Sequence, residues 1–112
     1  MYPSGVWRGY WDQTFFGRQP MGPLVLRFRA GVIEGEGRDV IGLFTFEGTY
    51  DDQGAIRMVK QYFGRHQVHY QGAYDGEGTI FGEWSIPPFS SGSFALSPVL
   101  GRPQADTPIE DL

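Results

Sequence analysis

The segment AIRMVKQYFGRHQVHYQGAY, residues 55–74, decides the fold of this chain. Apolar side chains recur at every second position in both of its halves, which is the side-chain period of a β-strand. Gly64 and Arg65 interrupt this alternation and predict a bend between two strands, over residues 55–63 and 66–74. The segment is therefore predicted to be a β-hairpin.

The same period continues along the chain on both sides of this hairpin. It predicts further strands over residues 5–13, 23–29, 32–42, 43–50, 79–86 and 93–97, with longer loops over residues 14–22 and 87–92. Glycine or proline interrupts every long window, so no helix is expected. Two segments, EGTYDDQG at 47–54 and QGAYDGEG at 71–78, share a pattern that predicts the same hairpin turn used twice.

Eight strands joined in order by short turns predict an all-β, single-domain, antiparallel up-and-down β-barrel. Closure is expected because it removes exposed sheet edges. A two-sheet sandwich is the alternative, but it usually needs longer crossover connections. The barrel domain is predicted over residues 1–97, and residues 98–112 are predicted to form a flexible acidic tail that contains proline.

Composition and charge exclude several classes of function. The chain has 112 residues, a formal net charge of −4 and a pI of about 5.0. An acidic chain whose nine basic residues are dispersed is expected to bind neither nucleic acid nor an anionic membrane surface. No apolar run is long enough to span a bilayer, and the N-terminus lacks the pattern of a signal peptide. Because the chain has no cysteine, disulfides and thiol chemistry are excluded, and a cytoplasmic location is the default expectation.

Strand alternation predicts a group of polar and aromatic side chains on the inner wall of the barrel. This group of candidate ligand-binding residues contains Trp7, Trp11, Asp39, Lys60, Tyr62, His66, Tyr70 and Trp84. One interpretation is a filled core in which Asp39 and Lys60 form an internal salt bridge. The other is a ligand pocket, because small-molecule sites combine aromatic walls with a few convergent polar groups.

No motif in the sequence specifies catalysis, a metal or a cofactor. His66 and His69 are three residues apart on a predicted strand, so they point to opposite faces and are not expected to bind one zinc ion together. The chain has no G-x-S-x-G nucleophile motif and no evident pair of nucleophile and base. We therefore expect no catalytic residues, no metal and no cofactor.

The segments GVWRGYW, residues 5–11, and GEWSI, residues 82–86, resemble the avidin and lipocalin-like (calycin-type) eight-stranded meander barrels. The resemblance covers most of residues 5–97 as an architecture, and Gly5 to Trp7 is its most characteristic piece. It implies a small ligand at the open end of the barrel, near inward aromatic side chains such as Trp7 and Trp84. The polar pattern of biotin binders is not recognisable, with Gly9 where avidins present an amide, and the terminal helix and disulfides of lipocalins are missing.

Three functions are compatible with these observations. The first is non-catalytic binding of a small, partly apolar ligand, anionic or carbonyl-bearing, at one barrel mouth. The alternative is a filled barrel that acts as a protein-interaction or oligomerisation module. Its outer face would form a homo-oligomer through the outward apolar residues Val25, Val40, Val59, Phe63 and Phe81. The third is a small barrel isomerase or cyclase that uses Lys60, His66 or a tyrosine.

Overall fold

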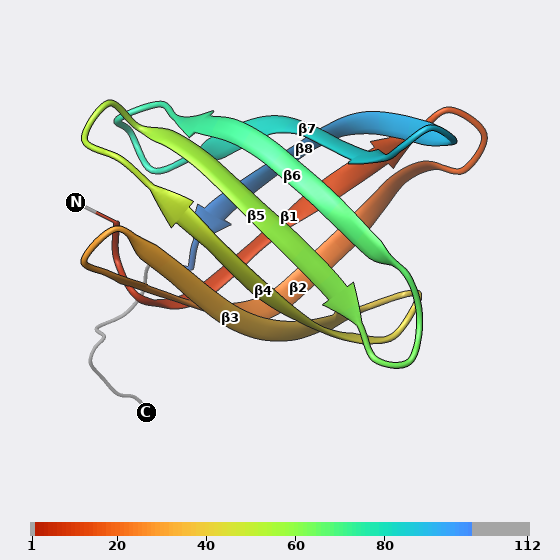
Figure 1. The fold of residues 1–112 in the computed structure, drawn as a ribbon, viewed down its shortest axis with the longest axis horizontal. Coiled ribbons are helices and arrows are strands. Elements are labelled where there is room, and N and C mark those ends of the chain that lie inside the picture. The colour runs from red at the N-terminus through yellow and green to blue at the C-terminus, as the bar shows by residue number, and fades with distance from the viewer. Residues whose placement is uncertain (1, 100–112) are drawn as a thin grey trace.

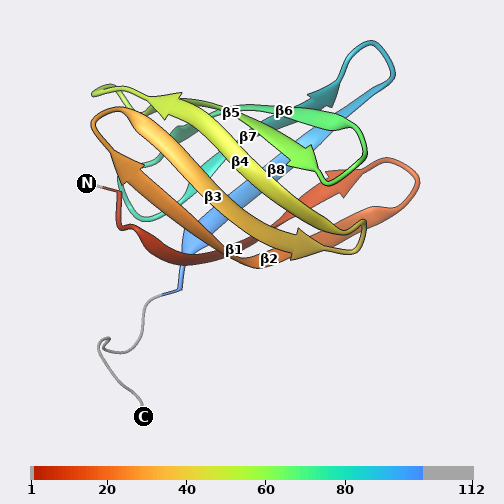
Figure 2. The ribbon, with the colours of Figure 1, turned by 60° about the horizontal axis from the view of Figure 1, so that its bottom comes forward.

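A computed structural model describes residues 2–99 and shows eight antiparallel strands that close into one barrel. The strands are β1 (Gly5–Gln13), β2 (Gly17–Arg29), β3 (Val32–Asp39), β4 (Leu43–Tyr50), β5 (Ala55–Tyr62), β6 (Gln67–Tyr74), β7 (Ile80–Ile86) and β8 (Ser90–Pro98). Each strand pairs with the next in sequence, and β1 pairs with β8 to close the barrel (Figures 1 and 2). The all-β, up-and-down barrel predicted from the sequence is confirmed. No helix long and apolar enough to cross a membrane occurs in the described residues.

The barrel has two unlike ends (Figure 1). The turns over residues 14–16, 40–42, 63–66 and 87–89 join β1 to β2, β3 to β4, β5 to β6 and β7 to β8, so they lie together at one end. We call this end the mouth. The other three turns, over residues 30–31, 51–54 and 75–79, lie at the opposite end with the start of the chain. We call that end the base.

The interior is filled by the side chains that the alternation predicted to point inward. Trp7, Leu26, Phe46 and Ile80 are at most 1% exposed, and Trp84 is 3% exposed. Edge-to-face aromatic contacts run through this core, as they do between Phe46 and Tyr70.

Inward glycines allow the strands to approach closely. A methyl group on Gly48 would lie 2.0 Å from the backbone oxygen of Arg57. Only glycine fits at this position of the barrel wall, because the neighbouring backbone occupies the place of a side chain.

The strand boundaries differ from the sequence-based prediction in several places. The predicted loop over residues 14–22 is wrong, because β2 already begins at Gly17 and reaches past two prolines. A register shift between Met21 and Leu24, beside the cis bond from Gly22 to Pro23, accommodates them in the sheet. Strand β3 ends at Asp39, so that residues 40–42 form a turn, and β8 begins at Ser90.

The base is closed by an aromatic plug that the sequence did not reveal. Tyr2 is 7% exposed and contacts Phe28, Tyr50 and Tyr74, with ring centroids 4.6 to 4.9 Å apart. Beyond these rings, the predicted repeat of one turn is confirmed. Asp51 Oδ1 accepts hydrogen bonds from the backbone N–H groups two and four residues later, and so does the Oδ1 of Asp75.

The last described strand reaches one residue into the predicted tail. Pro98 belongs to β8 and pairs with Trp7. The predicted flexible tail otherwise lies outside the described residues, which end at residue 99.

Candidate functional site

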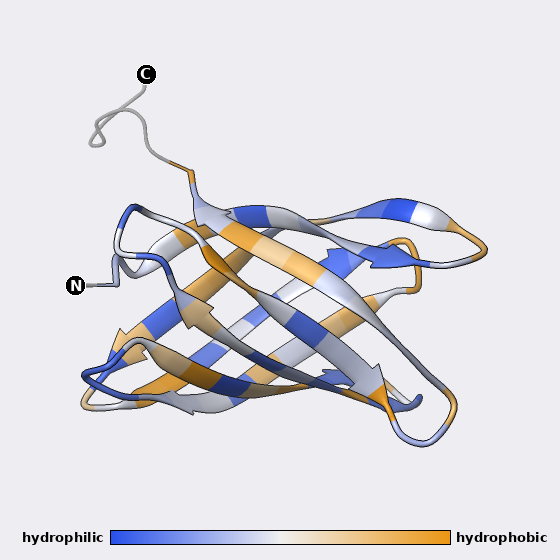
Figure 3. Ribbon diagram, turned by 90° about the horizontal axis from the view of Figure 1, so that it is seen from above, coloured by the Kyte–Doolittle hydropathy of each residue, from blue (hydrophilic) through white to orange (hydrophobic). Residues whose placement is uncertain are grey.

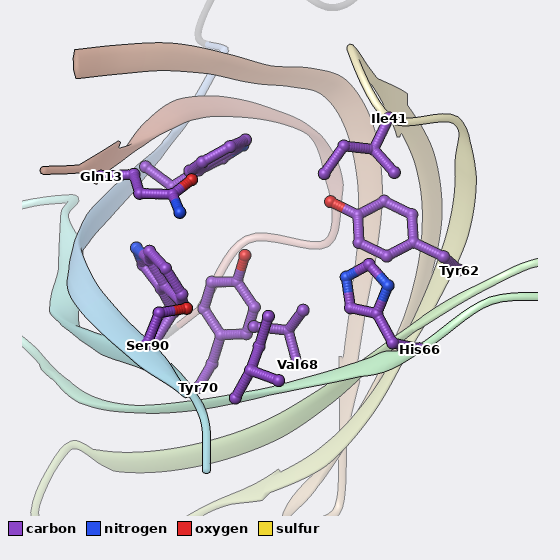
Figure 4. A pocket seen from close by; sticks show the side chains of 10 residues that line it. Gln13, Ile41, Tyr62, His66, Val68, Tyr70 and Ser90 are labelled. Carbon is purple, nitrogen blue, oxygen red and sulfur yellow. The ribbon is translucent and has the colours of Figure 1, made fainter. Parts of the chain in front are cut away.

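The mouth contains a small pocket with a cavity volume of about 50 Å³. Side chains from both aromatic and polar classes surround its central space (Figure 4). They are Trp11, Gln13, Ile41, Tyr62, His66, Val68, Tyr70, Trp84, Ile86 and Ser90. These residues come from five strands and from two of the mouth turns. The pocket therefore exists only in the closed barrel.

One wall of the pocket is formed by two tryptophans in edge-to-face contact. The rings of Trp11 and Trp84 lie 5.9 Å apart at an interplanar angle of 84°. Trp84 Nε1 donates a hydrogen bond of 2.9 Å to the backbone oxygen of Asp12. Trp11 Nε1, in contrast, is buried and has no hydrogen-bond partner within residues 2–99. A buried donor without an acceptor is unfavourable, so Trp11 is an unsatisfied group in the lining of the pocket.

Beneath the pocket, two tyrosines connect its lining to a buried ion pair. Tyr62 donates a hydrogen bond of 2.6 Å to Asp39 Oδ2, and Lys60 Nζ lies 2.6 Å from the same oxygen. The hydroxyl of Tyr70 lies 3.3 Å from Lys60 Nζ. The side chains of Lys60 and Asp39 are 1% and 0% exposed. The predicted Asp39–Lys60 contact is thus confirmed as a fully buried pair.

The ammonium group of Lys60 finds an acceptor for each of its three protons. They are Asp39 Oδ2, Tyr70 Oη at 3.3 Å and Met21 Sδ at 3.4 Å. The ring centroid of Phe44 lies 4.3 Å from Nζ and adds a cation–π contact. This complete set of partners explains how the core can hold a cation that burial alone would make very unfavourable.

Burial governs the protonation of this cluster. Loss of solvent lowers the pKa of Lys60 to about 8, although the hydrogen bond and charge of Asp39 act in the opposite direction. Burial raises the pKa of Tyr62 and of Tyr70 well above the ordinary tyrosine value, and the Asp39 carboxylate raises both further. Both tyrosines therefore stay protonated and act as hydroxyl donors at neutral pH.

Asp39 also links the ion pair to the rim of the pocket. Its Oδ1 accepts a hydrogen bond of 2.9 Å from the backbone N–H of Ile41, and its backbone exchanges two hydrogen bonds with Gly42. Ile41 lines the pocket. Both carboxylate oxygens thus have protein partners, and one of them holds the turn that borders the opening.

His66 lies in the turn that precedes β6, rather than at the start of the strand, and is exposed. Its ring packs against Tyr62 with centroids 5.1 Å apart and lines the pocket. His69 points outward and is exposed, as predicted.

The eight predicted site residues lie in three places in the structure. Five of them line the pocket together: Trp11, Tyr62, His66, Tyr70 and Trp84. Asp39 and Lys60 lie beneath it in the core. Trp7 packs against Phe28 toward the base, and its Nε1 donates to the backbone oxygen of Pro3. Trp7 therefore does not contribute to this pocket.

Sequence reasoning missed other residues of the site. Met21 was placed in a loop but is 1% exposed and contacts Lys60. Gln13 and Ser90 also line the pocket, and they stand at the end of β1 and at the start of β8. Alternation did predict that Ile41, Val68 and Ile86 point inward, but it gave no sign that they border a pocket.

The outward apolar residues predicted as an oligomer patch occupy separate places. Val25, Val59 and Phe81 lie on β2, β5 and β7, which are not neighbours in the barrel. Val40 and Phe63 lie in two different turns of the mouth, where they are 70% and 64% exposed.

Within residues 2–99 no three histidine, cysteine, aspartate or glutamate side chains are grouped so that they could hold a metal ion. Comparison with family models, with curated proteins and with solved structures gives no match for this chain. What the structure shows is a closed, eight-stranded, antiparallel barrel, an architecture that is compatible with the calycin-type barrels.

Proposed function

We propose that the chain is a non-catalytic binding protein that holds the carbonyl or carboxylate head of a small, partly apolar molecule in the mouth pocket. The observation that carries this proposal is Trp11 Nε1, a buried donor without a partner on the wall of an aromatic pocket. Indole N–H only donates, so the ligand must supply an acceptor. A carbonyl or carboxylate oxygen is the simplest group that meets this need.

The size of the pocket restricts what can enter. Pockets that enclose a whole drug-sized ligand measure roughly 300–1,000 Å³, whereas this one measures about 50 Å³. Only a head group of a few atoms would fit inside. The remainder of the ligand would lie over the opening, where Ile41 and the turns of the mouth offer apolar contacts. Calycin-type barrels, which share the closed eight-stranded architecture, hold small ligands at one open end, and this likeness supports a ligand at the mouth.

The ion pair beneath the pocket supports binding rather than catalysis. Lys60 is fully buried and its three protons are already directed to protein acceptors. A nucleophilic lysine would need a free, reachable amine. In this proposal the pair has a structural task, because it fixes the tyrosine rings that form the floor.

The experiment is a titration of the ¹⁵N-labelled protein with octanoate and with 2-octanone, followed through the three indole N–H signals. The Trp11 signal should shift and saturate with at least one of these probes. The variant Trp11→Phe keeps the ring but removes the donor, so its affinity should fall about three- to tenfold, as expected for one neutral hydrogen bond.

Trp7→Phe is the matched control, because Trp7 is also buried but its Nε1 bonds to Pro3 away from the pocket. This control should bind the probes like the wild type. If neither probe moves the Trp11 signal, or if Trp7→Phe weakens binding as much as Trp11→Phe, the proposal is overturned.

The filled interior favours the alternative, a barrel whose function lies on its outer surface. Large apolar and aromatic side chains are buried along the middle of the barrel, and the mouth pocket measures only about 50 Å³. Such a function would depend on exposed side chains and would be insensitive to Trp11→Phe.

A further inference from the structure

All four turns of the mouth carry large apolar side chains that project into solvent. Phe15, Phe16, Val40, Phe63 and Phe89 are 91%, 69%, 70%, 64% and 83% exposed. We call these five residues the apolar rim. Hydrophobic colour gathers at the turns of this end in Figure 3. Monomeric proteins rarely expose large apolar side chains together unless the surface contacts something.

The base has the opposite character. Its three turns contain no exposed large hydrophobic residue. Instead, Asp51, Asp52, Asp75 and Glu77 project from two of them and are exposed. The apolar rim is therefore a property of the mouth and not of turns in this barrel generally.

Charge at the mouth is basic, although the chain as a whole is acidic. The four mouth turns contain no acidic residue. Asp12 is paired with Arg18, and Asp39 is paired with Lys60 in the core. Arg38 and Arg65 are exposed beside the apolar rim and form no ion pair within residues 2–99.

We propose that the mouth docks onto the surface of an anionic lipid bilayer, with the apolar rim inserted among the lipids and Arg38 and Arg65 at the headgroups. Apolar tips combined with basic side chains are the features that bind peripheral proteins to anionic membranes. The acidic base would be repelled by the same surface, so charge would orient the barrel with its mouth toward the membrane.

Two features favour a bilayer over a second copy of the chain. The apolar rim consists of separate side chains on four turns around an opening. A fluid lipid surface can accept such side chains without complementary pockets. Two copies placed mouth to mouth would bring Arg38 and Arg65 toward the same groups of the other copy, and the three turns of the base offer no exposed large hydrophobic residue to the rim. The dispersed basic residues led us to expect no binding to an anionic membrane surface. The fold changes this expectation, because it brings two of these residues, Arg38 and Arg65, beside the phenylalanines of the apolar rim.

This inference goes beyond the proposed function, and its test is independent of the pocket. The full chain is sedimented with vesicles of phosphatidylcholine alone and of phosphatidylcholine mixed with phosphatidylserine. The wild type should bind the anionic vesicles more tightly than the neutral ones, and added salt should weaken the difference. The double variant Phe15→Ser/Phe89→Ser should bind the anionic vesicles at least about tenfold more weakly, because two phenyl rings are lost from the lipid.

Phe81→Ser is the matched control, since Phe81 is 48% exposed on the wall of the barrel, on β7. It should bind like the wild type, and so should Trp11→Phe even if probe binding in the pocket is lost. All altered rim side chains are exposed, so the variants should melt like the wild type.

Two results would overturn the inference. One is a wild type that sediments with neither kind of vesicle, or a Phe81→Ser variant that loses as much binding as the rim variant. The other is a concentration-dependent dimer in light scattering that the rim variant abolishes, because the rim would then be covered by a second copy.

Discussion

Replacing Lys60 by methionine should leave the Asp39 carboxylate buried without its counter-ion. Methionine has a similar length and suits an apolar core, so the main loss is the charge rather than the packing. Removing one partner of a buried ion pair leaves an uncompensated charge in the core, which costs roughly 3–5 kcal/mol. The expected loss in the free energy of unfolding is therefore about 3–5 kcal/mol at pH 7. Urea unfolding followed by tryptophan fluorescence at pH 7 measures this loss.

Arg27→Met is the matched control, because it removes the cation from the Arg27–Glu36 pair, whose side chains are 48% and 52% exposed. The loss there should stay below about 1 kcal/mol, as for other surface pairs. The double variant Lys60→Met/Asp39→Asn should recover much of the stability, since no buried charge is left. A Lys60→Met loss equal to that of Arg27→Met, or a double variant no more stable than Lys60→Met, would refute this account of the cluster.

Three further predictions concern the core. Lys60 is the only lysine of the chain, so its ¹³C-labelled Cε signal in NMR should titrate near the lowered pKa of about 8. The free energy of unfolding should rise from pH 8 to about 10, because in this range the unfolded lysine still holds the proton that the folded one has released. Titration at the ordinary lysine pKa would contradict this. Gly48→Ala should lower stability by about 1–3 kcal/mol in thermal melting, because its methyl group would meet the backbone oxygen of Arg57, and an unchanged melting temperature would be the contrary result. Tyr2→Ala should lower the free energy of unfolding by about 2–4 kcal/mol, because it opens the aromatic plug. Tyr2→Phe should be neutral or stabilising, because the buried hydroxyl has no partner within the described residues. Equal losses for the two variants in urea unfolding would contradict the role of the plug.

Much of the barrel interior could be predicted from local pattern. Alternation along the strands placed Phe46, Lys60 and Tyr70 inside, and the structure buries all three. The partnership of Asp39 and Lys60 could also be predicted, because two opposite charges on inward faces stabilise each other only if they meet. Met21 escaped prediction, since the prolines around it are normally signs of a loop.

The sequence by itself determined most of the strands, their faces and the buried ion pair of this protein, because the pleat of a strand repeats every two residues and so records which side chains leave solvent. Only the tertiary structure decided the volume of the pocket and the gathering of the apolar rim. The pocket is the space left between side chains of five strands and two turns, and the rim joins turns that are far apart in the chain. Neither has a local period, since both arise when β1 and β8 pair and the barrel closes.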